Sequence, residues 1–106
     1  MVEFYDTTLR DGSQAEGVAF SVEDKLIIIE ALDKLGIRYI EGGYPGSNPK
    51  DIEFFKRAKG MALETATIVP FGSTRYPTYT ADTDPNLAAL LDTGARTVTI
   101  LSLIHI

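Results

Sequence analysis

Three segments of the chain repeat apolar residues at the three- and four-residue spacing of an amphipathic helix. The first begins at Ser21, a good helix cap, and the other two begin with a polar cap followed by a proline, at residues 48–49 and 84–85. Lys25 and Asp33 lie mostly off the first apolar stripe. The positions predicted to face inward are Leu26, Ile28, Ile29, Leu32 and Leu35, then Ile52, Phe55 and Ala58, then Leu87, Leu90 and Leu91.

Short runs rich in β-branched and aromatic residues alternate with these helices. The predicted strands span residues 2–6, 37–41, 65–69 and 97–100, and Pro70 opens a loop after the third. The strand starts are about 30 residues apart, which is the period of a βα unit and predicts parallel strands. The pattern alone leaves a TIM barrel and a flavodoxin-like sheet equally open.

Composition narrows the class of protein. The chain has 106 residues, which is too few for a whole TIM barrel of roughly 250 residues. A net charge of −5 argues against a nucleic-acid partner, and the absence of cysteine excludes disulfides and thiolate metal sites. The chain also lacks an apolar signal core and a membrane-length apolar run, so a cytoplasmic location with no membrane partner is predicted.

Candidate chemistry gathers where the predicted strands end. Arg10, Asp11 and Gln14 follow the first strand, and Glu41 closes the second. A carboxylate is a hard oxygen ligand for a divalent cation, while a guanidinium is a forked, permanent cation for a substrate carboxylate or an oxyanion. The carboxyl ends of parallel strands meet on one face, so these residues are predicted to share it. Without a wider pattern, a solvated loop with a local ion pair and a backbone-bonded strand end remain the simpler interpretations.

A wider pattern exists. The motif Leu9-Arg10-Asp11-Gly12-x-Gln14, followed after a spacer by Lys25, resembles the N-terminal signature of the 2-isopropylmalate, homocitrate and citramalate synthases. These are metal-dependent TIM-barrel enzymes related to 3-hydroxy-3-methylglutaryl-CoA lyase. Residues 39–51, which read YIEGGYPGSNPKD, are most similar to the citramalate synthase branch. The resemblance implies an α/β fold, the first half of a TIM (β/α)8 barrel, truncated, with about four strands and three helices.

The resemblance also implies roles. Asp11 would be a ligand of the catalytic divalent metal (Mg, Mn, Zn or Co). Arg10 would be catalytic and substrate-binding, neutralising charge on carbonyl and enolate oxygens, with the catalytic Glu41 orienting it. Gln14 would line the substrate pocket. The implied reaction condenses acetyl-CoA, the cosubstrate, with a 2-oxo acid (pyruvate to citramalate) in branched-chain amino acid biosynthesis, by a full-length homodimer that takes only small-molecule substrates.

Three departures limit the match. Tyr44 stands where the citramalate synthase branch usually has tryptophan, and residues 76–79 are unlike the usual continuation, so a plain surface loop is favoured for Arg75. The family's two histidine ligands form a His-x-His motif, whereas this chain has one histidine, His105, in an unrelated context. The chain alone is therefore expected to be inactive.

The resemblance ends after residue 100. Residues 1–100 are predicted to be the N-terminal part of the catalytic barrel domain, and residues 101–106 a non-native tail. The tail, LSLIHI, matches the translation of a transposon-end adapter used in sequencing libraries. Alternative functions are a 2-isopropylmalate or homocitrate synthase, a carbon–carbon lyase of the 3-hydroxy-3-methylglutaryl-CoA type, or a non-enzymatic α/β binding module.

Overall fold

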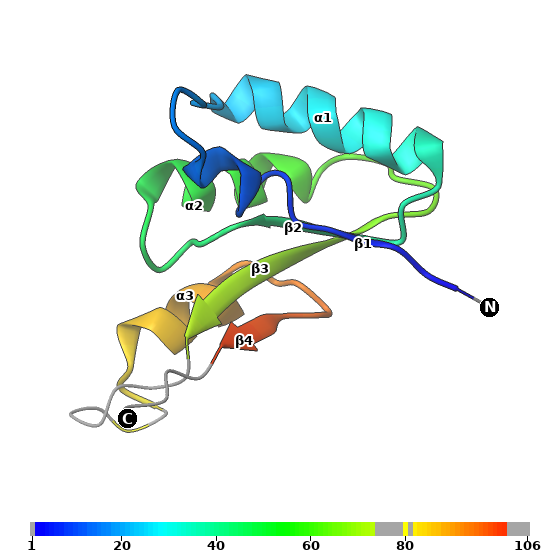
Figure 1. Ribbon diagram of the computed structural model, residues 1–106. Coiled ribbons are helices and arrows are strands. Elements are labelled where there is room, and N and C mark those ends of the chain that lie inside the picture. Colours follow the sequence, from blue (N-terminus) through cyan, green and yellow to red (C-terminus); the bar gives the residue numbers. More distant parts are fainter. Residues whose placement is uncertain (1, 74–79, 81, 102–106) are drawn as a thin grey trace.

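The computed structural model describes residues 2–73, 80 and 82–101 (Figure 1). Within these residues, four strands form one sheet: β1 (Tyr5–Asp6), β2 (Tyr39–Gly43), β3 (Thr67–Ser73) and β4 (Thr99–Leu101). Helices α1 (Val22–Leu35), α2 (Pro49–Ala58) and α3 (Pro85–Asp92) alternate with the strands, and a short 3-10 turn, η1 (Gly12–Gln14), precedes α1.

The order of the strands identifies the fold. All three neighbouring pairs are parallel and the sheet order is β1-β2-β3-β4, so each helix returns the chain to the adjacent position. A flavodoxin-like sheet would place the first strand between the second and third. Figure 1 shows α1 and α2 one above the other on the same side of β1 and β2. The predicted half of a TIM barrel is confirmed.

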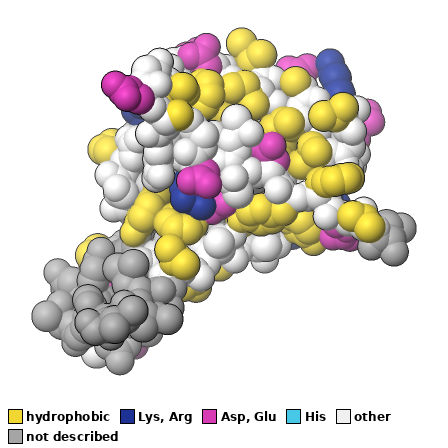
Figure 2. Space-filling model, in the orientation of Figure 1, with side chains coloured by type: hydrophobic (Ala, Val, Ile, Leu, Met, Phe, Trp, Pro, Cys, Tyr) yellow, Lys and Arg dark blue, Asp and Glu magenta, His cyan; other side chains and the backbone are white. Residues whose placement is uncertain are grey.

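The sheet is curved. Tyr5 on β1 is hydrogen-bonded through its hydroxyl to the Thr99 hydroxyl on β4, although two strands separate β1 from β4 in the sheet. Side chains alternate between the two faces of a strand, so Glu41 and its register partner Val69 lie on the same concave side as Tyr5. In Figure 2, hydrophobic side chains spread over this view of the molecule with small groups of charged side chains among them.

The core lies between the convex side of the sheet and the helices. Its buried residues are Leu9, Ile29, Ile40, Phe54, Phe55 and Ala58. Gly42 belongs to this packing, because a Cβ there would lie 2.5 Å from the Phe54 ring. The absent side chain therefore makes room for an aromatic ring.

The predicted starts of the three helices are confirmed. Ser21 and Asp24 form a reciprocal capping box at the start of α1, and Gly36 ends it with a φ of 93°. The Asn48 side chain accepts from the backbone N–H of Lys50 at 3.0 Å, with Pro49 in the first turn of α2. Asp84 accepts from the N–H of Leu87 at 3.2 Å at the start of α3. These local signals act within one turn, which explains why the sequence reveals them.

Several predicted inward positions are wrong. Leu35 is 75% exposed, Leu91 80% and Ile52 43%, whereas Phe54, outside the predicted stripe, is fully buried. Phe54 and Phe55 pack edge to face, 5.2 Å between ring centroids, so two consecutive residues of α2 share the core. A strict three- and four-residue spacing cannot describe such a wide buried face.

The bounds of β2 and β3 also differ from the prediction. β3 continues through Pro70 and Gly72, where a loop was predicted. Pro70 pairs with Gly43 at a point where the register with β2 shifts, so the missing proline N–H falls at an irregularity of the ladder. β2 likewise continues to Gly43. Arg75 and residues 76–79 lie outside the described residues, as do His105 and residues 102–106 of the predicted tail, while Leu101 ends β4.

Candidate functional site

Arg10 and Glu41 form a forked ion pair at the carboxyl ends of the first two strands. The Arg10 Nε donates to Glu41 Oε1 at 3.2 Å, and Nη2 donates to Oε2 at 3.5 Å. The Glu41 side chain is 1% exposed, whereas that of Arg10 is 20% exposed. The carboxylate is thus more deeply buried than the guanidinium that it binds. The predicted proximity of Arg10 and Glu41 is confirmed.

An aromatic ring supports the same guanidinium. The Arg10 Cζ lies 4.1 Å from the centroid of the Phe71 ring, within the range of a cation–π contact. Tyr44 packs edge-on against Phe71 at 5.2 Å, and its hydroxyl donates to the Ser73 hydroxyl at 3.5 Å. Sequence reasoning missed the support from Phe71 because it placed this residue in a loop. Its alternation with Val69 along β3 was the available signal.

Asp11 is placed differently from Glu41. Its side chain is 61% exposed, and its Oδ1 lies 3.5 Å from Arg10 Nη1. An open carboxylate beside a cationic site suits one ligand of a hard divalent cation. Among the described residues, no cluster of three or more His, Cys, Asp or Glu side chains could hold a metal ion. These residues therefore offer Asp11 as a single ligand and do not form a complete metal centre.

Gln14 ends η1 and is exposed to solvent. Among the described residues, no hydrogen bond joins its amide to Arg10 or Glu41. The turn that carries it is ordered by backbone bonds, including Gln14 N–H to the Asp11 carbonyl at 3.1 Å. The structure thus places Gln14 in the same turn as Asp11 without bringing it into the ion pair.

Tyr5 is a further polar group at this site that sequence reasoning treated only as a strand residue. Burial raises the pKa of its phenol, the hydrogen bond between the Tyr5 and Thr99 hydroxyls opposes that rise, and the Glu41 carboxylate adds to it. The phenol therefore stays protonated at neutral pH and can donate a hydrogen bond on the concave side.

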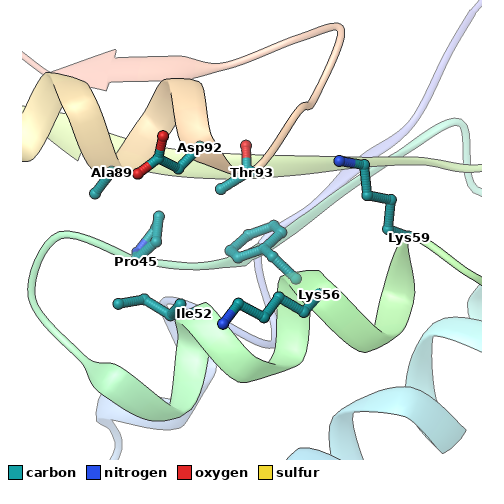
Figure 3. Close-up of a pocket in the computed structure, with 8 residues that line it drawn as sticks. Pro45, Ile52, Lys56, Lys59, Ala89, Asp92 and Thr93 are labelled. Atoms are coloured by element: carbon teal, nitrogen blue, oxygen red, sulfur yellow. The ribbon is translucent and has the colours of Figure 1, made fainter.

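A separate cavity of about 240 Å³ lies between α2 and α3 (Figure 3). Its walls include Ile52 and Lys56 of α2 and Ala89 and Asp92 of α3. None of the residues predicted to form the site lines it. We therefore place the candidate site at the Arg10–Glu41 pair and not in this gap between helices.

Comparison with known proteins agrees with this architecture. The HMGL-like family model matches residues 1–102, and the chain belongs to that family. The chain is 54% identical over 100 residues to an (R)-citramalate synthase of Geobacter sulfurreducens, covering 94% of this chain and 19% of the relative. It is 55% identical over 96 residues to an (R)-citramalate synthase of Synechocystis sp., covering 91% and 18%.

A second group of relatives matches over a shorter stretch. A 2-isopropylmalate synthase of Lactococcus lactis subsp. cremoris is 45% identical over 65 residues, covering 61% of this chain and 13% of the relative. The chain spans about a fifth of the length of the citramalate synthases that it matches, with 19% covered in the Geobacter protein. In the described part of the chain, no helix is long and apolar enough to cross a membrane.

Proposed function

We propose that the complete protein containing this chain is an acyltransferase that condenses acetyl-CoA with pyruvate to form citramalate and free CoA. The observation that carries the proposal is the Arg10 guanidinium, held by Glu41 at 3.2 Å and by the Phe71 ring at 4.1 Å at the carboxyl ends of the strands. In TIM barrels this end of the strands carries the catalytic residues. The similarity to (R)-citramalate synthases over most of the chain supports this choice of reaction.

Arg10 has a defined task in such a reaction. When the acetyl methyl carbon, after losing a proton, attacks the carbonyl carbon of a 2-oxo acid, the carbonyl oxygen gains negative charge. A cation already fixed in place stabilises that charge without reorganising at the moment of reaction. Glu41 and Phe71 supply the fixing, since both contact the guanidinium on its buried side. Water then hydrolyses the thioester, which releases CoA.

Asp11 and Gln14 complete the proposed site within this chain. Asp11 would supply one ligand to a divalent metal ion, which when bound polarises the carbonyl of the 2-oxo acid. The exposed Gln14 amide, in the same turn, would contact the substrate. The complete protein is further proposed to be a cytoplasmic homodimer acting on small molecules. The metal's remaining ligands and the base that removes the methyl proton would come from residues outside the described chain.

The test is a substrate panel with the complete purified protein. We expect release of free CoA from acetyl-CoA in the presence of pyruvate, citramalate as the product by mass spectrometry, and loss of both after metal chelation. A preference for 2-oxoisovalerate would instead identify a 2-isopropylmalate synthase, which the shorter match leaves as the second candidate. A preference for 2-oxoglutarate would indicate homocitrate synthesis, and cleavage of 3-hydroxy-3-methylglutaryl-CoA a lyase. Absence of turnover with every substrate would favour a binding module.

A further inference from the structure

We infer that Lys25 and Asp51 are positioning residues: their buried ion pair clamps Gly42–Tyr44, where β2 ends and the chain enters the following turn (the clamped turn), and so holds Glu41 and Tyr44 in place around Arg10. The inference rests on the proposed function insofar as it concerns catalysis. Its structural part concerns the turn at Gly42–Tyr44 and stands on contacts within the described residues.

The clamp is formed by two helices that the sequence separates widely. Lys25 in α1 lies with its Nζ 2.6 Å from Asp51 Oδ1 in α2, and the two side chains are only 7% and 8% exposed. The same Nζ donates to the Gly42 carbonyl at 2.9 Å. The other Asp51 oxygen accepts from the backbone N–H of Tyr44 at 2.9 Å. The ion pair is thus hydrogen-bonded to the backbone of the residues on both sides of Gly43.

The absence of a side chain at Gly43 leaves room for the Asp51 carboxylate. A Cβ at this position would lie 2.5 Å from both the Asp51 Cγ and Oδ2. The register between β2 and β3 also shifts between Glu41 and Gly43, so the ladder is irregular at this turn. Irregularities of this kind re-aim neighbouring side chains. The clamp supplies the fixed contacts where the ladder is irregular.

The clamped turn adjoins two residues that support Arg10, Glu41 by direct contact and Tyr44 through Phe71. Glu41, directly before Gly42, holds the guanidinium at 3.2 Å. Tyr44, directly after Gly43, packs on Phe71, whose ring lies 4.1 Å from the Arg10 Cζ. Displacement of the turn would therefore disturb both supports of the guanidinium together.

A contribution to the stability of the fold does not by itself explain why Lys25 and Asp51 form a buried ion pair. Desolvation of two buried charges offsets much of their attraction, and an apolar pair of similar volume often stabilises a fold as well or better. An apolar pair could not, however, donate to the Gly42 carbonyl and accept from the Tyr44 N–H. The ion pair therefore adds two hydrogen bonds to the clamped turn that an apolar pair would lack. For this reason we assign the ion pair a positioning role.

The catalytic part is tested in the complete protein with Lys25→Met, Asp51→Asn and the double variant. Each single variant leaves a buried charge without its partner, so both stability and kcat fall, the latter by about 100-fold if the turn shifts on the scale of 1 Å. The KM for acetyl-CoA stays unchanged, because the clamp acts on the Arg10 supports. In the double variant the uncompensated charge is gone and stability recovers, but the Gly42 carbonyl still lacks its donor. There kcat stays low.

A matched control is Asp33→Asn, which weakens another buried carboxylate that binds backbone N–H groups, at residues 64–66. It should lower stability while leaving kcat at the wild-type value. Recovery of kcat together with stability in the double variant, or an unchanged kcat in both single variants, would overturn the positioning role.

Hydrogen exchange of the backbone amides, measured without substrate, separates this inference from the proposed reaction. In Lys25→Met we expect faster exchange at Tyr44 and its neighbours, with residues 64–66 as in the wild type, and the reverse pattern in Asp33→Asn. Unchanged exchange at Tyr44 would contradict the clamp. If the wild-type protein makes no citramalate but Tyr44 responds as described, the proposed function fails and the clamp stands.

Discussion

Two buried carboxylates order loops at opposite ends of this half-barrel, and they do so with different partners. Asp33, near the end of α1, accepts backbone N–H groups of Glu64, Thr65 and Ala66 at 3.0, 2.7 and 2.7 Å, just before β3. Asp51 accepts one backbone N–H just after β2 and also holds the buried Lys25 ammonium. At the amino ends of the strands, the hydrogen bonds of the carboxylate within the described residues all go to backbone N–H groups. At the carboxyl ends, the carboxylate is half of an ion pair that binds the backbone next to Glu41 and Tyr44.

Two arginines repeat the contrast. Arg38, just before β2, donates to the Thr67 hydroxyl at 2.6 Å and the Thr65 carbonyl at 3.2 Å, and its Cζ lies 4.9 Å from the Tyr39 ring centroid. Arg10 also lies over an aromatic ring but is forked onto a buried carboxylate. Both arginines thus lie against an aromatic ring, but Arg38 links neighbouring strands at the amino ends, whereas Arg10 is a fixed cation at the carboxyl ends. Function in parallel barrels is expected at that second end.

The largest effect is expected for Arg10→Lys in the complete protein. Lysine keeps the charge but cannot reproduce the fork onto Glu41, so kcat should fall by about 100- to 1000-fold, as when an oxyanion-stabilising donor is removed. Steady-state kinetics with pyruvate and acetyl-CoA measure it. Arg38→Lys is the matched control and should retain wild-type kcat. Equal losses in both variants would remove the distinction between the two ends.

Asp11→Asn should weaken metal binding, because it removes an anionic oxygen from a site for a hard cation. Loss of a supporting residue around a metal commonly costs about 10- to 100-fold in affinity, and loss of a direct ligand should cost at least as much. Isothermal titration of the complete, metal-free protein with Mn²⁺ measures the affinity. Glu41→Gln, which alters a residue proposed to support Arg10, should leave that affinity close to the wild-type value. Wild-type affinity in Asp11→Asn would exclude Asp11 as a ligand.

Gly43→Ala should damage both stability and turnover, since the new methyl group would meet the Asp51 carboxylate at 2.5 Å. Overpacking of this kind costs about 1–3 kcal/mol of unfolding free energy. Gly60→Ala is the control, because a Cβ there would find its nearest neighbour, the Arg57 carbonyl oxygen, at an ordinary 3.7 Å. Thermal melts and kcat of both variants make the comparison. Tolerance of alanine at Gly43 would show that the clamped turn has room to move.

The smallest effect concerns pH. Backbone N–H groups of Glu64 first, then of Ala66 and Thr65, lower the pKa of Asp33 in the folded protein. Its ionised form therefore stabilises the fold fully above the ordinary carboxyl pKa of roughly 4, and this contribution is lost as the pH falls through the lower folded value. The difference in Tm between wild type and Asp33→Asn should be constant near neutral pH and shrink in acid. A difference that grows in acid would contradict this sign.

Local signals made much of the fold predictable. Helix caps and the regular strand spacing gave the order of elements, and the strand ends gave the shared face of Arg10, Asp11 and Glu41. The burial of Lys25 and Asp33 was not predictable, because both lie off the apolar stripe of α1 and their partners are far along the chain. Phe71 was missed because a proline usually interrupts a strand. In this protein, Pro70 lies at a register shift, and the strand continues past it. Periodicity describes one element at a time and cannot detect polar contacts between elements.

The most direct measurement is a crystal structure of the complete protein with Mn²⁺ and pyruvate, with the metal located by anomalous scattering. We expect Mn²⁺ bound to the Asp11 carboxylate and pyruvate in contact with the Arg10 guanidinium, while Glu41 and Phe71 still contact that guanidinium. Pyruvate bound in the cavity between α2 and α3, or a metal without Asp11 among its ligands, would contradict this expectation.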